Sequence, residues 1–220
     1  MNINPAARRI LCFGDSNTWG YAPDTNHERY AADIRWTGVL QKALGDGFEV
    51  IEEGLNSRRI SSDDPRLGKE GRNALSYILP CLDTHDPIDT CILFLGTNDL
   101  KPDMGLSAAQ IAENLGRLIS TIQNRKSQCI ENHKVRTVIV VPPRIDENTP
   151  YTSKDGKYKG TAAKALALRT EYAKIAGSTH SILVDIQDQL ETGGDGIHLT
   201  AASHTLLGAA IARVIHEAAA

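Results

Sequence analysis

The stretch ILCFGDSNTWGYAP, residues 10–23, passes from continuously apolar residues straight into a polar turn. Apolar residues without polar alternation are typical of a strand that is covered on both faces, as in a parallel sheet. Ligands of such sheets bind beyond the carboxyl ends of the strands. Asp15, Ser16 and Asn17 directly follow this predicted strand, so they form a candidate functional site. A strand that ends on a glycine is by itself also a common structural turn.

Four more apolar runs share this character. They are FEVIEE (48–53), TCILFLG (90–96), VRTVIVV (135–141) and SILVD (181–185). Amphipathic spacings predict helices over residues 35–44 and 164–176, and after the capping residues Ser107 and Thr200. Alternating strands and helices form right-handed βαβ units. The sequence therefore predicts an α/β protein with one domain over residues 1–220, a three-layer α/β/α sandwich around a five-stranded parallel sheet.

The composition argues against several kinds of partner. The chain has 24 Lys and Arg against 27 Asp and Glu, a net charge of −3, which disfavours binding to nucleic acid or to a membrane surface. The N-terminal residues MNINPAARR lack the apolar segment of a secretory signal. The four cysteines form no CxxC pair and are expected to be buried, reduced thiols. We therefore expect a cytoplasmic protein.

No sequence motif indicates a metal or a cofactor. The chain contains no GxGxxG motif, no Walker-type lysine loop, no HExxH motif and no cysteine–histidine cluster. We expect neither a metal nor a cofactor.

Two long polar segments, residues 57–73 and 144–161, interrupt the pattern of strands and helices. Loops of this length in a compact domain are usually functional or mobile. Arg58 and Arg59 in the first segment, and Lys101 elsewhere, could meet an anionic substrate. The default expectation for the two arginines is that they are solvated loop side chains.

Polar residues also follow three other predicted strands, in the segments GLNSRR (54–59), GTND (96–99) and DGIHLT (195–200). Together with Ser16 they offer a hydroxyl, backbone N–H groups, a side-chain amide and an Asp–His pair. Acyl transfer needs this set of groups. Each feature alone is more often a turn or a helix cap. Their occurrence at successive strand ends favours a catalytic site.

The Asp–His pair can activate the serine. A serine hydroxyl becomes a good nucleophile only when a base takes its proton, and an imidazole is suited to this near neutral pH. Asp195 precedes His198 by three residues, so it can hold one ring nitrogen while the other faces Ser16. The N–H of Ser16, the amide of Asn98 and a backbone N–H within residues 54–59 can then bind the oxyanion.

This series of motifs resembles the blocks of the SGNH hydrolase superfamily, also called GDSL-type esterases. FGDSNTWG, EEGLNSRR, LGTND and DGIHLT occur in the order of those blocks. The longer stretches RILCFGDSNTWGYAP, RWTGVLQKALGDGFEVIEEGLNSR and DPIDTCILFLGTND resemble one branch, the bacterial arylesterases and acetylesterases that include a mycobacterial esterase with acyltransferase activity. The resemblance is weak between residues 144 and 182.

The resemblance implies a flavodoxin-like SGNH hydrolase fold and a triad. It implies Ser16 as the nucleophile, completed by Asp195 and His198, and Asn98 as an oxyanion donor beside the N–H of Ser16. Many members of the superfamily add the N–H of a glycine before a polar or basic residue. Ser57 stands at that position here.

Four further residues receive roles beside this resemblance. We expect Ser57 to supply the remaining oxyanion donor through its backbone, and Gly54 to form a turn. Trp19 and Tyr21 follow the nucleophile closely and are expected to line the substrate channel, with core packing as the alternative.

The leading hypothesis is a serine esterase that hydrolyses small acyl esters, acetyl esters first, and that can pass the acyl group to an alcohol. A carbohydrate acetylesterase is the alternative within enzymes. A lysophospholipase or thioesterase is weaker, because no long apolar channel is indicated. A catalytically silent ligand-binding domain on the same fold is a further alternative, against which the intact set of Ser, His, Asp and Asn argues. The expected partners are a small-molecule ester and, from the oligomers of the branch, further copies of the chain.

Overall fold

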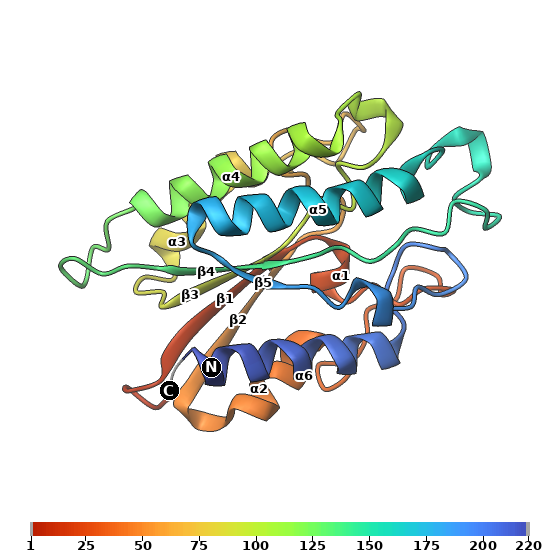
Figure 1. Cartoon of the computed structure of the whole chain (residues 1–220). Coiled ribbons are helices and arrows are strands. Elements are labelled where there is room, and N and C mark those ends of the chain that lie inside the picture. Colours follow the sequence, from red (N-terminus) through yellow and green to blue (C-terminus); the bar gives the residue numbers. More distant parts are fainter. Residues whose placement is uncertain (1, 219–220) are drawn as a thin grey trace.

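Five parallel strands form the centre of the molecule (Figure 1). The structure, a computed structural model, describes residues 2–218. The strand order is β2-β1-β3-β4-β5, and every neighbouring pair is parallel. Each predicted run overlaps one strand, so the predicted sheet is confirmed. The bounds are β1 Arg8–Gly14, β2 Phe48–Gly54, β3 Thr90–Phe94, β4 Arg136–Val140 and β5 Ile182–Val184.

Helices cover both faces of the sheet, as the predicted sandwich requires (Figure 1). On one face lie α2 (Trp36–Leu44) and α6 (Ala201–Glu217), and on the other lie α3 (Ala74–Thr84), α4 (Ala108–Asn124) and α5 (Thr161–Thr179). In β1, Leu11 and Phe13 join the apolar core beneath α3, α4 and α5, whereas Ile10 and Cys12 join the core against α2 and α6. Both faces of β1 are therefore buried, which explains its unbroken apolar run.

The sequence pattern misses one helix, α3. Pro80 lies in its interior, and a proline there removes a backbone donor and clashes with the preceding turn. The helix forms because its apolar face is buried, with Ile78, Cys81 and Leu82 almost fully covered. The side chain of Asn73 caps its start by accepting a hydrogen bond from the N–H of Leu75, 3.0 Å away.

The strand order creates a crevice between β1 and β3. The chain leaving β1 leads to α2 on one face of the sheet, and the chain leaving β3 leads to α4 on the other. Open α/β sheets bind ligands at such a switch point. The polar residues after β1 and β3 therefore flank the crevice.

The surface agrees only in part with the expectations for the cysteines. Cys12, Cys81 and Cys91 are buried, but Cys129 is exposed in the turn-rich segment after α4, so the expectation of burial is wrong for this residue.

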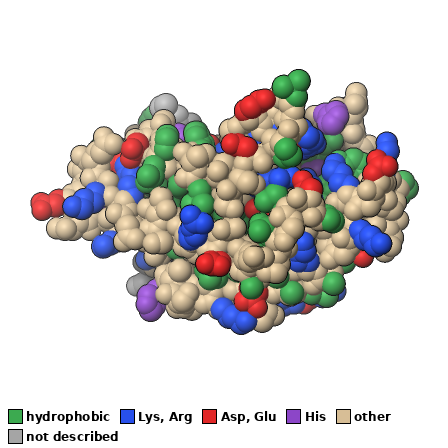
Figure 2. Space-filling view, turned by 90° about the horizontal axis from the view of Figure 1, so that it is seen from above, with side chains coloured by type: hydrophobic (Ala, Val, Ile, Leu, Met, Phe, Trp, Pro, Cys, Tyr) green, Lys and Arg blue, Asp and Glu red, His purple; other side chains and the backbone are tan. Residues whose placement is uncertain are grey.

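Figure 2 shows acidic, basic and apolar side chains interspersed on one face of the molecule. None of the helices within residues 2–218 combines the length and the apolar character needed to cross a membrane.

Candidate active site

Ser16 is the first residue of α1 (Ser16–Trp19), a short helix directly after β1. The Asp15 side chain caps this helix by accepting the N–H of Asn17 at 2.9 Å. A β-carbon on Gly54 would lie 2.2 Å from the backbone nitrogen of Trp19, so only glycine lets α1 pack against the end of β2. The expectation that Gly54 forms a turn is wrong: Gly54 ends β2 and permits this close approach.

The structure brings Ser16, His198 and Asp195 together in a hydrogen-bonded chain. Ser16 Oγ lies 2.9 Å from Nε2 of His198, and Nδ1 of His198 lies 2.6 Å from Oδ2 of Asp195. Oδ1 of Asp195 also accepts the N–H groups of Ile197 and His198, both at 2.9 Å. Burial by itself would raise the pKa of Asp195, but the hydrogen bonds and the charge of His198 outweigh it and lower that pKa. The carboxylate is therefore held in its charged form.

Asn17 ties the two ends of the chain together at this site. Its Oδ1 accepts the N–H of Leu199 at 2.9 Å, and its Nδ2 lies 3.5 Å from the carbonyl of Ile197. Asn17 is completely buried, so these bonds replace the water that its amide would otherwise need. The sequence places Asn17 in the candidate site after the first strand but does not indicate these bonds. The bonds fix the segment that carries His198 against the helix that carries Ser16.

Two hydrogen bonds orient the amide of Asn98, which follows β3. Nδ2 donates to the carbonyl of Arg58 at 3.1 Å, and Oδ1 accepts from Nζ of Lys101 at 2.8 Å. A lysine can only donate and a carbonyl can only accept, so this pair of partners assigns the amide orientation. The second N–H of the amide has no protein acceptor among residues 2–218, and Asn98 lines the same cavity as Ser16. This N–H can therefore donate to a bound ligand.

Ser57 adopts a backbone conformation that usually belongs to glycine. Its φ is +67°, in the left-handed region that glycine favours. A serine at this position therefore carries backbone strain that a glycine would avoid. Within residues 2–218 the N–H groups of Ser57 and Ser16 donate to no other protein group. Both residues line the same cavity as Asn98.

Arg58 and Arg59 are buried, so the expectation of solvated side chains is wrong. The guanidinium of Arg58 donates to the carbonyl of Gly14 at 2.9 Å and also to that of Glu53, and it lies 4.0 Å from the ring centre of Phe13. Arg59 pairs with Asp103 at 2.7 Å. Arg58 therefore holds the ends of β1 and β2, the strands that precede Ser16 and Ser57.

Replacing Arg58 by Met is expected to lower the free energy of unfolding by about 2–4 kcal/mol, because buried carbonyls lose their donor. Urea unfolding measures this loss. Arg117→Met is the matched control, since Arg117 is exposed on α4. A loss at Arg58 no larger than that at Arg117 would contradict the structural role.

Burial shifts the pKa of three further side chains beside the site. It raises the pKa of Asp15 to about 6 and that of Asp99 to about 7. It lowers the pKa of Lys101 to about 8, with help from the positive charges of Lys157 and Arg66. The floor of the crevice is thus poorly solvated, and electrostatic interactions there are stronger than in water.

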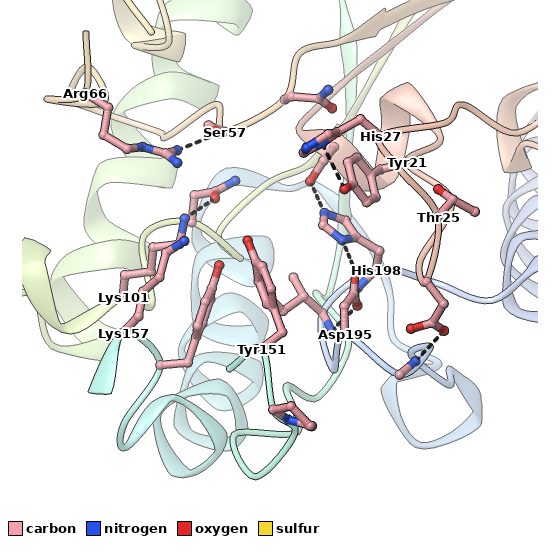
Figure 3. Close-up of a pocket in the computed structure, with 18 of the residues that line it drawn as sticks. Tyr21, Thr25, His27, Ser57, Arg66, Lys101, Tyr151, Lys157, Asp195 and His198 are labelled. Carbon is pink, nitrogen blue, oxygen red and sulfur yellow. Dashed lines mark hydrogen bonds and ion pairs between the residues drawn. The ribbon is translucent and has the colours of Figure 1, made fainter. Parts of the chain in front are cut away.

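A cavity of about 590 Å³ opens above Ser16. Tyr21 lines it and stacks on the imidazole of His198, with ring centres 4.2 Å apart. Trp19 does not line it, contrary to expectation: Arg29 covers its ring at 5.1 Å. Figure 3 shows His198 and Tyr21 on one side of the cavity. Arg66, Lys101 and Lys157 lie on the other side.

The two long polar segments form much of the cavity wall. Of their lining side chains, the sequence indicates only Ser57 as a site residue. The segment 57–73 contributes Ser57, Arg66 and Lys69, and the segment 144–161 contributes Pro150, Tyr151, Lys157 and Tyr158. His27 also lines the cavity and pairs with the hydroxyl of Tyr21 at 3.1 Å.

One group of side chains within residues 2–218 has the spacing of a metal site: Glu53, Cys81 and His85. None of the three lines the cavity. Burial raises the pKa of Cys81 to about 12, so its thiol keeps the proton that a metal ligand must lose. The group fits a metal poorly. Glu53 and His85 instead contact each other at 3.2 Å.

Comparisons relate this chain to known proteins. The model of the GDSL-like lipase/acylhydrolase family matches residues 12–206. Among solved structures, the aryl esterase of M. smegmatis is 35% identical, with a TM-score of 0.88, over 96% of this chain and 99% of that one. A carbohydrate acetylesterase from Sinorhizobium meliloti is 32% identical, with a TM-score of 0.88 and the same two coverages.

A curated relative resembles part of the chain. An acetylxylan esterase from Xylanibacter ruminicola is 25% identical over 140 residues, which is 62% of this chain. The match spans only 26% of that esterase, so most of its sequence lies outside the match.

Proposed function

The chain belongs to the GDSL-like lipase/acylhydrolase family and is a hydrolase of the esterase type, and from that premise we propose a serine esterase that cleaves small acyl esters through Ser16, His198 and Asp195. The observation that carries the proposal is the hydrogen-bonded chain from Ser16 through His198 to Asp195, at 2.9 and 2.6 Å. It joins residues 182 positions apart, at the carboxyl edge of the sheet.

The first half-reaction forms an acyl-enzyme. Ser16 Oγ attacks the carbonyl carbon while Nε2 of His198 takes the hydroxyl proton, and Asp195 holds the imidazole and stabilises its positive charge. The N–H groups of Ser16 and Ser57 and the amide of Asn98 bind the tetrahedral oxyanion. The ester C–O bond then breaks, and the alcohol leaves with the proton from His198.

The second half-reaction releases the acid. His198 takes a proton from water, the resulting hydroxyl adds to the acyl carbon, and Ser16 leaves with the proton. An alcohol in place of water gives a new ester, so acyl transfer uses the same intermediate. The amount of ester formed in the presence of ethanol measures this partition.

Acetyl esters are the proposed substrates, and acetylated carbohydrates are the second candidate. The names of the similar proteins support both, since they include a carbohydrate acetylesterase and an acetylxylan esterase. A silent binding domain is disfavoured, because the nucleophile, base and carboxylate are all present and hydrogen-bonded.

A panel of substrates tests this assignment. We expect kcat/KM to fall from p-nitrophenyl acetate to the butyrate and the octanoate. Acetate release from acetylated xylose, compared with that from the aryl acetate, decides between the two candidates. A wild-type protein that is inert on the whole panel would refute the proposed function.

A further inference from the structure

Basic side chains gather on one side of the cavity. Four of them line it: Arg66, Lys69, Lys101 and Lys157. Figure 3 shows Arg66, Lys101 and Lys157 facing the side that carries His198 and Asp195, with Tyr151 between them. Two carboxylates, Asp24 and Asp195, complete the charged lining. The cavity lining is therefore net positive, although the whole chain carries a net charge of −3.

The protein itself leaves most of this positive charge uncompensated. Arg66 pairs with Asp64, and its second contact is the hydroxyl of Ser57 at 3.0 Å. Within residues 2–218, no carboxylate lies within ion-pair distance of the ammonium groups of Lys69, Lys101 or Lys157. Lys101 donates only to the neutral amide of Asn98. An anion in the cavity would find several unpaired cations.

The carboxylates of the lining are already occupied. Asp195 holds His198, and Asp24 accepts the N–H of Gly194 at 2.7 Å. Asp103, at the neighbouring cleft, pairs with Arg59. None of these pairs neutralises the three lysines. The lowered pKa of Lys101, caused by burial and then by the charges of Lys157, Arg66 and Arg59, fits a surplus of positive charge.

Aromatic rings accompany the cations. Lys157 lies 5.3 Å from the ring centre of Tyr151 and 5.5 Å from that of Tyr158, and Lys101 lies 5.4 Å from Tyr158. Tyr158 is buried whereas Tyr151 is half exposed. The two rings form an aromatic wall of the cavity, and the Tyr151 ring is the more accessible of the two. Such a wall suits a flat aromatic or sugar ring whose acidic group reaches the ammonium groups.

We propose that the preferred substrate is an acetyl ester whose alcohol part carries an anionic group, a carboxylate or a phosphate, bound by Lys157 and Lys69 beside the tyrosine wall. The anion belongs to the alcohol part because an acetyl group has no place for it. This inference rests on the proposed function. Lys69 and Lys157 are specificity-determining residues in this account, whereas Ser16, His198 and Asp195 perform the reaction.

Matched esters test the inference. The anionic substrates are 4-acetoxybenzoate and 4-acetoxyphenyl phosphate, and the neutral one is methyl 4-acetoxybenzoate. The measured quantity is the ratio of kcat/KM for each anionic ester to that for the neutral ester. Comparing this ratio between protein variants cancels both the intrinsic reactivity of the esters and any loss of folded protein.

Lys157→Gln is expected to lower this ratio about fivefold, and the double variant with Lys69→Gln about tenfold or more, as loss of one or two charge contacts in a high dielectric predicts. Lys157→Arg should keep most of the preference. Lys159→Gln is the matched control, since Lys159 is exposed in the same segment and does not line the cavity. Added salt should reduce the wild-type ratio.

The outcomes separate the two proposals. If the wild type hydrolyses the esters and the ratio is unchanged in both glutamine variants, the inference is overturned while the esterase assignment stands. If the wild type hydrolyses none of the esters, the proposed function fails and the inference fails with it. A fall confined to one anionic ester supports the inference and identifies the carboxylate or the phosphate as the group that is bound.

Discussion

Replacing Ser16 by Ala is expected to lower kcat for p-nitrophenyl acetate by about 10⁴-fold or more, because the variant has no nucleophile to form the acyl-enzyme. His198→Gln should cause a loss of similar size, since the base and the nucleophile act as one unit. The double variant should lose little more than either single variant, because removing one member already disables the unit.

The matched control for this prediction is Ser178→Ala. It removes an exposed hydroxyl from α5, and Ser178 does not line the cavity. It should keep wild-type activity. A Ser16→Ala protein that retains more than about 1% of wild-type kcat would be incompatible with a nucleophilic role.

Asn98→Ala should have the largest effect after the Ser16 and His198 variants, a fall in kcat of about 10²- to 10³-fold with little change in KM. The amide is held by Arg58 and Lys101 before substrate arrives, so its N–H contributes mainly when negative charge develops on the carbonyl oxygen. Steady-state kinetics with p-nitrophenyl acetate separates the two constants. An increase in KM with unchanged kcat would instead indicate simple substrate binding.

Lys101 gives this prediction a dependence on pH. Its pKa is lowered to about 8, so it is charged below that pH and becomes neutral as the pH rises through it. The charged form polarises the amide of Asn98, and kcat should therefore decline on the alkaline side. Lys101→Met should show a lower kcat without that decline. An unchanged alkaline limb in the variant would assign the decline to another group.

The sheet and the approach of Ser16, Asn98 and His198 to one another could be predicted from the pattern of apolar runs. Burial on both faces forces unbroken apolar runs, and the parallel arrangement brings the strand ends to one edge. Ser16, Asn98 and His198 each follow a strand or precede a helix at that edge. Their convergence therefore follows from the topology, without knowledge of individual contacts.

The contacts that could not be predicted depend on distant backbone groups. Arg58 is buried because the carbonyls of Gly14 and Glu53 accept its guanidinium, and the sequence contains no sign of those acceptors. Residues 144–161 dock on the segment that carries His198: the N–H of Asp146 donates to the carbonyl of Gly196 at 2.9 Å, and Oγ1 of Thr149 donates to that of Asp195 at 3.3 Å. Tyr151, Lys157 and Tyr158 of this segment line the cavity, and no local pattern in the sequence indicates that placement.

The central claim is that His198 activates Ser16 as a nucleophile, and covalent labelling tests it most directly. A fluorophosphonate should react with one equivalent of protein as Ser16 Oγ bonds to phosphorus, fluoride leaves and His198 takes the proton. Peptide mass spectrometry should locate the adduct on Ser16, and His198→Gln should slow its formation by several orders of magnitude. No adduct on a folded, active protein, or an adduct on another residue, would contradict the account.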